Sequence, residues 1–214
     1  MHRRILSLLA LVALLLVGSA LPAQARAALP PNAHPMGQSH EEWLRDVGQF
    51  FLGDSSNPLF AGLEGDCGQL IDGVFFMVAP IDVGVELECE IPVGTAIVLS
   101  HAGCFTLEDA VLDTDAELIE SADEGFVFTS NSVTVDGKPV RLHTVHAGAF
   151  DVISEPGSFY DEVFGAGTGP IRTALTGNVT FLHPMRPGEH VIEAEVTLPI
   201  CGGSFSATYH IDVG

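Results

Sequence analysis

Apolar and polar residues alternate along several short stretches of this chain, and a period of two predicts β-strands with one buried face. The clearest stretch is 85–91, where valine, leucine, cysteine and isoleucine alternate with Glu86, Glu88 and Glu90. Residues 190–198 and 205–213 show the same alternation. They predict two further strands with one apolar and one polar face.

Unbroken apolar runs predict strands that are buried on both faces. Two such runs are residues 74–78 and 96–99. We expect further strands at 179–182 and within 126–135, which is followed by the tight turn at Asp136-Gly137. Many short strands separated by turn signals are typical of a sandwich. We therefore expect a mainly β fold, an antiparallel β-sandwich or jelly-roll-like domain over residues 39–214.

Two regions break the strand rhythm. Ser39-His40-Glu41-Glu42 is a capping box, so we expect an N-terminal helix that begins there and ends at Gly53. Residues 106–124, with Thr106 as a cap, predict one or two short inserted acidic helices. The proline-rich residues 26–38 predict an extended leader, and 154–170 predict a long loop.

The first 25 residues predict where the protein acts. A basic start at His2-Arg3-Arg4 precedes a short apolar run, and Ala23-Gln24-Ala25 has the small-residue pattern of a signal-peptidase site. An uncleaved membrane anchor is the alternative. Residues 1–25 therefore predict a signal peptide and a secreted protein, extracellular or periplasmic, with no membrane span in the mature chain.

Charge and cysteine content restrict the partners. The whole chain has a formal charge of −20. Cleavage of the predicted signal peptide would remove Arg3 and Arg4, so the mature chain would have 6 basic and 28 acidic residues, a charge of −22. Such an acidic protein is not expected to bind nucleic acids or anionic membranes, because their negative charges repel it. Outside the cytoplasm, four cysteines predict two disulfides in one of three connectivities, with a zinc site as the alternative. The cysteines are Cys67, Cys89, Cys104 and Cys201.

Several segments together resemble a family of uncharacterised secreted bacterial proteins. They include Trp43, Asn57-Pro58, Gly65-Asp66-Cys67 with Gln69, Val74-Phe75-Phe76, Cys89-Glu90-Ile91-Pro92-Val93-Gly94, Val135-Asp136-Gly137-Lys138 and Pro187-Gly188-Glu189-His190-Val191-Ile192. The resemblance implies an exported β-rich domain in which Cys67 and Cys89 pair, and it implies no activity. We therefore favour the disulfides Cys67–Cys89 and Cys104–Cys201.

Motifs for catalysis or metal binding are weak. No G-x-S-x-G sequence occurs, and the H-x-x-H pair His143 and His146 lies on an expected strand, where the two side chains point to opposite faces. The acidic segment has no glycine at the sixth place of a calcium loop, which argues against an EF-hand. A looser calcium site formed by Asp109, Asp113 and Asp115 remains as a candidate, so no cofactor is expected other than calcium.

These observations favour a non-enzymatic, disulfide-stabilised binding or cell-surface protein of unknown oligomeric state. Its ligand would be a saccharide, a cation or another protein. Trp43, Phe159, Tyr160 and Phe164 would stack on a sugar, with Phe159-Tyr160 as the exposed pair. The alternative is a secreted hydrolase whose acid and base are carboxylates and a histidine from among His143, His146 and His183.

Overall fold

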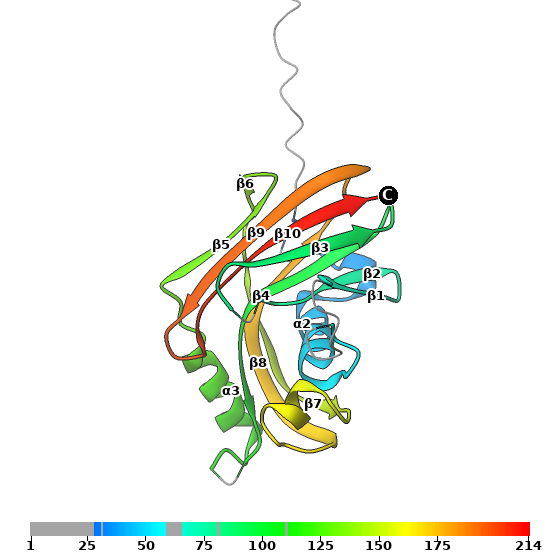
Figure 1. Cartoon of the computed structure of the whole chain (residues 1–214). Coiled ribbons are helices and arrows are strands. Elements are labelled where there is room, and N and C mark those ends of the chain that lie inside the picture. Colours follow the sequence, from blue (N-terminus) through cyan, green and yellow to red (C-terminus); the bar gives the residue numbers. More distant parts are fainter. Residues whose placement is uncertain (1–27, 31, 59–65, 81, 110) are drawn as a thin grey trace, which may run out of the picture.

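Two five-stranded β-sheets form a sandwich in the computed structural model, which describes residues 28–30, 32–58, 66–80, 82–109 and 111–214 (Figure 1). Sheet A has the strand order β1-β2-β4-β8-β7, and sheet B has the order β3-β10-β9-β5-β6. Sheet A comprises β1 (Gly68–Ile71), β2 (Val74–Met77), β4 (Ala96–Leu107), β7 (Thr144–Ser154) and β8 (Gly169–Leu182). Sheet B comprises β3 (Val85–Ile91), β5 (Ser130–Val135), β6 (Lys138–Pro139), β9 (Gly188–Leu198) and β10 (Gly203–Val213).

The predicted mainly β sandwich is confirmed, but its sheets are mixed rather than wholly antiparallel. β2 pairs parallel to β4, and β3 pairs parallel to β10, while all other strand pairs are antiparallel. Alternation along one strand reports its buried face and not the direction of its neighbour. For this reason the sequence pattern did not reveal the parallel pairs.

The N-terminal helix is confirmed. α2 (His40–Gly48) continues into a π-helical turn, η2 (Gln49–Gly53), and a 3-10 turn, η1 (Pro35–Gly37), precedes it. The Ser39 hydroxyl accepts a bond from the Glu42 N–H, and the Glu42 carboxylate accepts one from the Ser39 N–H at 2.7 Å. Trp43 is only 6% exposed, and its indole N–H donates to the Pro35 carbonyl. The leader is therefore packed against α2 at this point.

The inserted helix is shorter than the sequence pattern predicts. α3 (Asp115–Gly125) begins with its own capping box, formed by Thr114 and Glu117. Thr106 is not a cap, because β4 continues to Leu107 in register with β8. Ends of other segments also differ from the prediction, since β5 begins only at Ser130 and the expected 154–170 loop contains a short helix, α4 (Phe159–Glu162).

The helices cover opposite faces of sheet A. Leu175 lies against Gly48 of α2, whereas the preceding residue, Ala174, packs with Leu118 and Ala122 of α3. Sheet B lies over the same face as α3, because Ala102 and Cys104 of β4 cluster with Val196 and Leu198 of β9. The layers are therefore α2, then sheet A, then sheet B with α3 beside it.

Two disulfides connect the layers. Cys67, directly before β1, bonds to Cys89 of β3, and Cys104 of β4 bonds to Cys201 in the turn between β9 and β10. Each bond therefore joins sheet A to sheet B. These are the pairs that the sequence analysis favours, and disulfides of this kind are typical of an oxidising, extracytoplasmic compartment. The predicted signal peptide, residues 1–25, lies outside the described residues.

Candidate functional site

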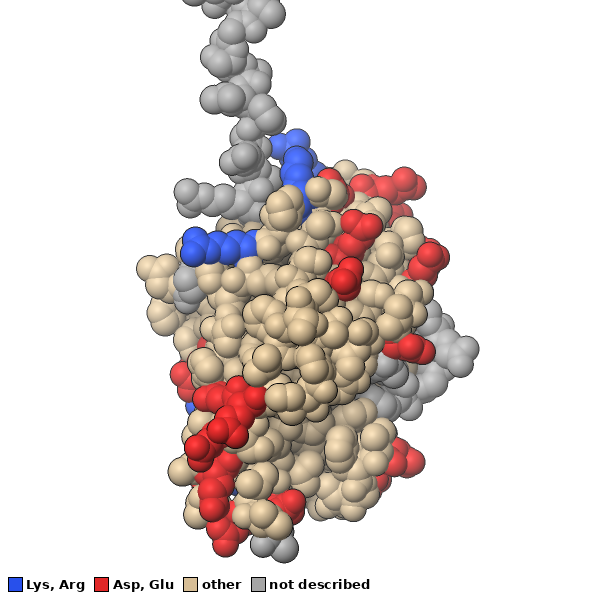
Figure 2. Space-filling model, turned by 90° about the vertical axis from the view of Figure 1, so that its left-hand side faces the viewer, with Lys and Arg blue, Asp and Glu red and all other residues tan. Residues whose placement is uncertain are grey.

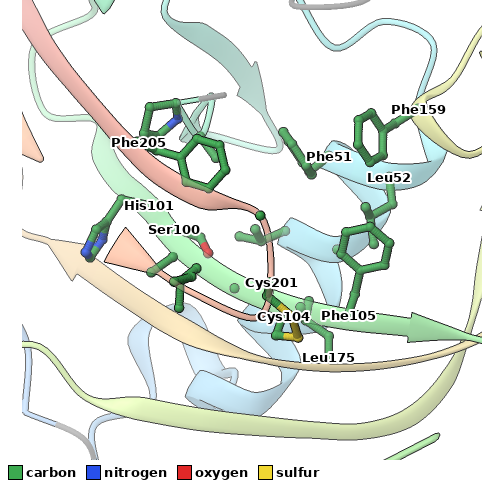
Figure 3. A pocket seen from close by; sticks show the side chains of 18 of the residues that line it. Phe51, Leu52, Ser100, His101, Cys104, Phe105, Phe159, Leu175, Cys201 and Phe205 are labelled. Carbon is green, nitrogen blue, oxygen red and sulfur yellow. A yellow bond between two sulfur atoms is a disulfide. The ribbon is translucent and has the colours of Figure 1, made fainter. Parts of the chain in front are cut away.

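An apolar groove of about 610 Å³ runs along β4 where its neighbour β2 has ended (Figure 3). β2 pairs with β4 only as far as Leu99, and the chain then leaves through Ala79 and Pro80. Beyond that point β4 has β8 on one side and the groove on the other. The groove therefore exists because β2 has four residues and β4 has twelve.

One wall of the groove comes from the α2 layer. Phe51 of η2 lies against Phe159, the first residue of α4, with ring centroids 5.3 Å apart (Figure 3). Leu52 and Phe164, which follows α4 in sequence, also line the groove. The Phe105 ring packs edge-on against Phe164 with ring centroids 5.4 Å apart, and against Phe159 at 6.1 Å. Phe164 is nevertheless 48% exposed. This wall is a set of interlocked aromatic rings whose outer member is open to solvent.

The opposite wall is the turn between β9 and β10. Ile200 and Gly202 of this turn line the groove together with Phe205 of β10, and Ile200 is 67% exposed. The Cys104–Cys201 disulfide fixes this turn to β4 at the floor of the groove, as Figure 3 shows. The two walls thus belong to different layers, and a covalent bond fixes the second wall to the floor of the groove.

A short chain of polar groups lies at one end of the groove. The His101 Nε2–H donates to Asn131 Oδ1 at 2.6 Å, and Asn131 donates in turn to Asn178 at 2.6 Å. The other ring nitrogen, His101 Nδ1, is buried without a hydrogen-bond partner. Desolvation lowers the pKa of His101, although the bond to Asn131 opposes this shift, so the ring is neutral at pH 7. His101 and Ser100 sit at the register shift in β4 that a β-bulge produces.

The groove is uncharged in a strongly acidic protein. Its described lining contains no aspartate, glutamate, lysine or arginine, although the chain has 28 acidic residues. On the face drawn in Figure 2 the acidic side chains lie along the margins, with a broad uncharged area between them. A second hollow of about 470 Å³ on sheet B has the opposite character, because Glu88, Glu90, Glu189 and Asp212 line it. The apolar groove is therefore the place suited to a neutral, hydrophobic ligand.

The structure does not bring the predicted calcium ligands together. Asp109 accepts the backbone N–H groups of Val111 and Leu112 at 2.7 and 2.8 Å. Asp115 forms two hydrogen bonds with Arg172, which hold the pKa of that carboxyl below its ordinary value. Across the part of the chain that the structure describes, no three His, Cys, Asp or Glu side chains are placed to hold a metal ion. The site expected from Asp109, Asp113 and Asp115 is thus not formed.

The predicted histidines are also separated. His146 contacts Asp123 of α3 at 2.8 Å and Thr176 at 3.3 Å, and Thr176 donates to the same carboxylate. The His146 contacts both use Nδ1, so the ring cannot receive a proton from Thr176 on one nitrogen while Asp123 orients the other. His143 directly precedes β7, and its carbonyl accepts a hydrogen bond from the Asn178 side chain, while His183 is exposed. None of the three lines the groove.

Of the four aromatic residues proposed for sugar stacking, two are unavailable. Trp43 is a core residue, and Tyr160 is fully buried with its hydroxyl 2.9 Å from that of Thr173. Burial raises the pKa of Tyr160 far above its ordinary value. The prediction that Phe159-Tyr160 is an exposed pair is therefore wrong, because Tyr160 pins the loop. Phe159 and Phe164 instead become part of the groove.

The groove itself could not be predicted from the sequence pattern. The residues that line it include members of α2, η2, β4, α4 and the β9–β10 turn. In each of these segments taken alone, apolar residues predict an ordinary buried core position and not a binding site. One signal was present. A proline stands two residues after the apolar run 74–78, whereas no proline follows the run 96–99 before residue 139, so only the second strand can extend further.

Comparisons with known proteins add no family. No protein-family model and no curated protein matches the chain. A solved structure described as "Structure of PbICP-C in complex with falcipain-2" is similar with a TM-score of 0.26 and 8% identity, covering 64% of this chain and 95% of that one. A similarity of this size carries no argument about fold or function. We find no described helix that is long and apolar enough to cross a bilayer.

Proposed function

We propose that this protein is a secreted, non-catalytic binding protein, and that the apolar groove along β4 binds a neutral hydrophobic ligand. The observation that carries the proposal is an open groove of about 610 Å³ with no charged side chain in its described lining. Binding pockets for organic ligands have this size and character, since apolar contact supplies most of the affinity and a few polar groups set orientation. Here the polar groups are Ser100 and His101.

Two further features support a binding role. The exposed apolar side chains Val163, Phe164 and Ile200 stand at the groove mouth, 57%, 48% and 67% exposed, where leaving them in water is unfavourable unless a ligand covers them. The disulfides support secretion, together with the signal peptide proposed for residues 1–25. We also propose residues 39–214 as one domain and membership of the uncharacterised secreted bacterial family that the motifs resemble.

The hydrolase alternative lacks comparable support. His146, Asp123 and Thr176 are in contact, but the histidine serves both partners through one nitrogen. These residues also lie outside the groove lining. We therefore propose no reaction for them.

The proposal is tested by titrating the purified chain with N-phenylnaphthylamine, a neutral apolar dye that fluoresces when it leaves water. We expect saturable binding that weakens about tenfold in Ile200→Glu, because the new carboxylate must be desolvated against the bound dye. Val93→Glu is the matched control, since Val93 is 56% exposed and lies outside the groove. Absence of saturable binding, or equal affinity in both variants, would overturn the proposal.

A further inference from the structure

On the groove side of β4, the backbone has hydrogen-bonding groups that no described residue pairs with. The Glu108 N–H donates to the Arg172 carbonyl, so Glu108 and Arg172 form one of the hydrogen-bonded residue pairs between the antiparallel chains of β4 and β8. Because hydrogen-bonded pairs alternate along the strand, Thr106 and Cys104 also direct their backbone groups to β8. Gly103, Phe105 and Leu107 must then direct theirs to the other side. For these three residues, the described chain forms no hydrogen bond on that side.

The other long edge of sheet A is closed. β7 lies at that edge, and Gln49 of η2 reaches it with both ends of its amide: Nε2 donates to the Ile153 carbonyl at 2.9 Å, and Oε1 accepts the Ile153 N–H at 2.8 Å. Arg45 of α2 donates to the Ala147 carbonyl at 2.9 Å. Helix side chains therefore occupy the positions where a further strand would pair.

The edges of sheet B are also unsuited to pairing. β3 carries Glu86, Glu88 and Glu90 in a row, and like charges on an edge strand oppose the approach of another strand. The opposite edge strand, β6, has only two residues, one of which is a proline. Among the described strands, the overhang of β4 is thus the long edge with neither side-chain caps nor charge.

We infer that this edge accepts an extended peptide segment, which takes the position that β2 vacates and pairs with Gly103, Phe105 and Leu107. This inference rests on the proposed function and names the class of ligand. Strand addition gains its affinity from backbone hydrogen bonds and its specificity from pockets for alternate side chains. The groove supplies both elements at one place.

The walls define the chemistry of the peptide. Side chains pointing to one face would meet Phe51, Phe159 and Phe164, and those pointing to the other would meet Ile200 and Phe205. Both walls are apolar, so the segment must be apolar on both faces, as β2 itself is. Pairing from Gly103 to Leu107 requires about five residues, roughly 16 Å of extended chain. A neutral segment is favoured, because burying a charge against these walls is costly.

The experiment uses backbone chemistry to separate strand addition from simple hydrophobic binding. The probe is a capped peptide of five alternating leucine and alanine residues with a glycine-serine tail, titrated by calorimetry against the whole chain. Two analogues carry N-methyl groups on alternate nitrogens, one on the odd and one on the even positions. Only every second N–H of an added strand faces β4, so we expect one analogue to bind at least about tenfold more weakly and the other to retain affinity.

Each outcome decides between explanations. Equal binding of both analogues and the parent would overturn strand addition, while the groove would remain a hydrophobic site. Binding of N-phenylnaphthylamine without peptide binding would have the same meaning. Failure of dye and peptide alike would overturn the proposed function as well. A dimer at micromolar concentration that the peptide does not dissociate would assign the edge to a second copy, and so would refute the inference.

In the protein, the matched substitutions are Val163→Glu on the groove mouth and Val93→Glu outside it, both at exposed valines. We expect the first to weaken peptide binding about tenfold and the second to leave it within about twofold. Equal effects of the two substitutions would show that charge alone, and not the groove, governs binding. Unchanged thermal unfolding of both variants confirms that the fold is retained.

Discussion

Removing the Cys104–Cys201 disulfide should damage both stability and ligand binding, whereas removing Cys67–Cys89 should damage stability alone. The two bonds span 97 and 22 residues of sequence. The chain-entropy relation gives about 4.7 kcal/mol for the longer loop and about 3.4 kcal/mol for the shorter one. Both bonds join sheet A to sheet B, but only the first lines the groove.

The assay is guanidinium unfolding of two double variants, Cys104→Ala/Cys201→Ala and Cys67→Ala/Cys89→Ala, with linear extrapolation to water. We expect the first to lose about 1 kcal/mol more unfolding free energy than the second. N-phenylnaphthylamine should then bind about fivefold more weakly to the first variant, because the β9–β10 turn is no longer fixed to β4. A reversed order of stabilities would refute the loop argument. Undiminished dye binding would refute the role of the bond in the groove.

Three further predictions concern individual contacts. Gly125→Ala should lower the unfolding free energy by about 1–3 kcal/mol, because the new methyl group would lie 2.8 Å from Cys201 Sγ. This loss should vanish in the Cys104→Ala/Cys201→Ala variant. Acid should destabilise the protein as the pH falls below about 6.5, because the unfolded chain binds a proton at His101 and the folded chain, in which burial lowers the pKa of this ring, does not. The unfolding free energy should fall by at most about 1.4 kcal/mol per pH unit from this residue. His101→Gln should flatten this slope in thermal melts, and an unchanged slope would exclude His101 as its source. Gln49→Ala should uncap Ile153 on β7 and promote aggregation in light scattering, while Gln49→Glu, which keeps only the acceptor, should give an intermediate result.

The local pattern of the sequence predicts the sandwich well. Strict alternation located the buried faces of β3, β9 and β10, and the capping box located the start of α2, because both signals depend on residues near in sequence. Thr106 shows the limit. It is followed by a helix-like spacing, yet it remains in β4, because pairing with β8 continues past the point where local preference changes.

The candidate site was much less predictable. Its key property is the difference in length between β2 and β4, which depends on pairing between segments and not on composition. The burial of Tyr160 was unpredictable for a related reason. A tyrosine in a glycine-rich loop favours an exposed ring, but the Tyr160 hydroxyl lies within hydrogen-bonding distance of Thr173 of β8 and the ring is buried. Asp115 likewise suggested a cation site, but its partner in the structure is Arg172 of β8.

The Gln49 amide on Ile153 has a consequence for stoichiometry. Because side chains of α2 and η2 cap this edge of sheet A, the described strands offer the proposed peptide one long position, along β4. On the proposed function, binding would therefore be monovalent. Whatever it holds, it would act by sequestering one partner at a time, and cross-linking or fibre growth would require that cap to be broken first.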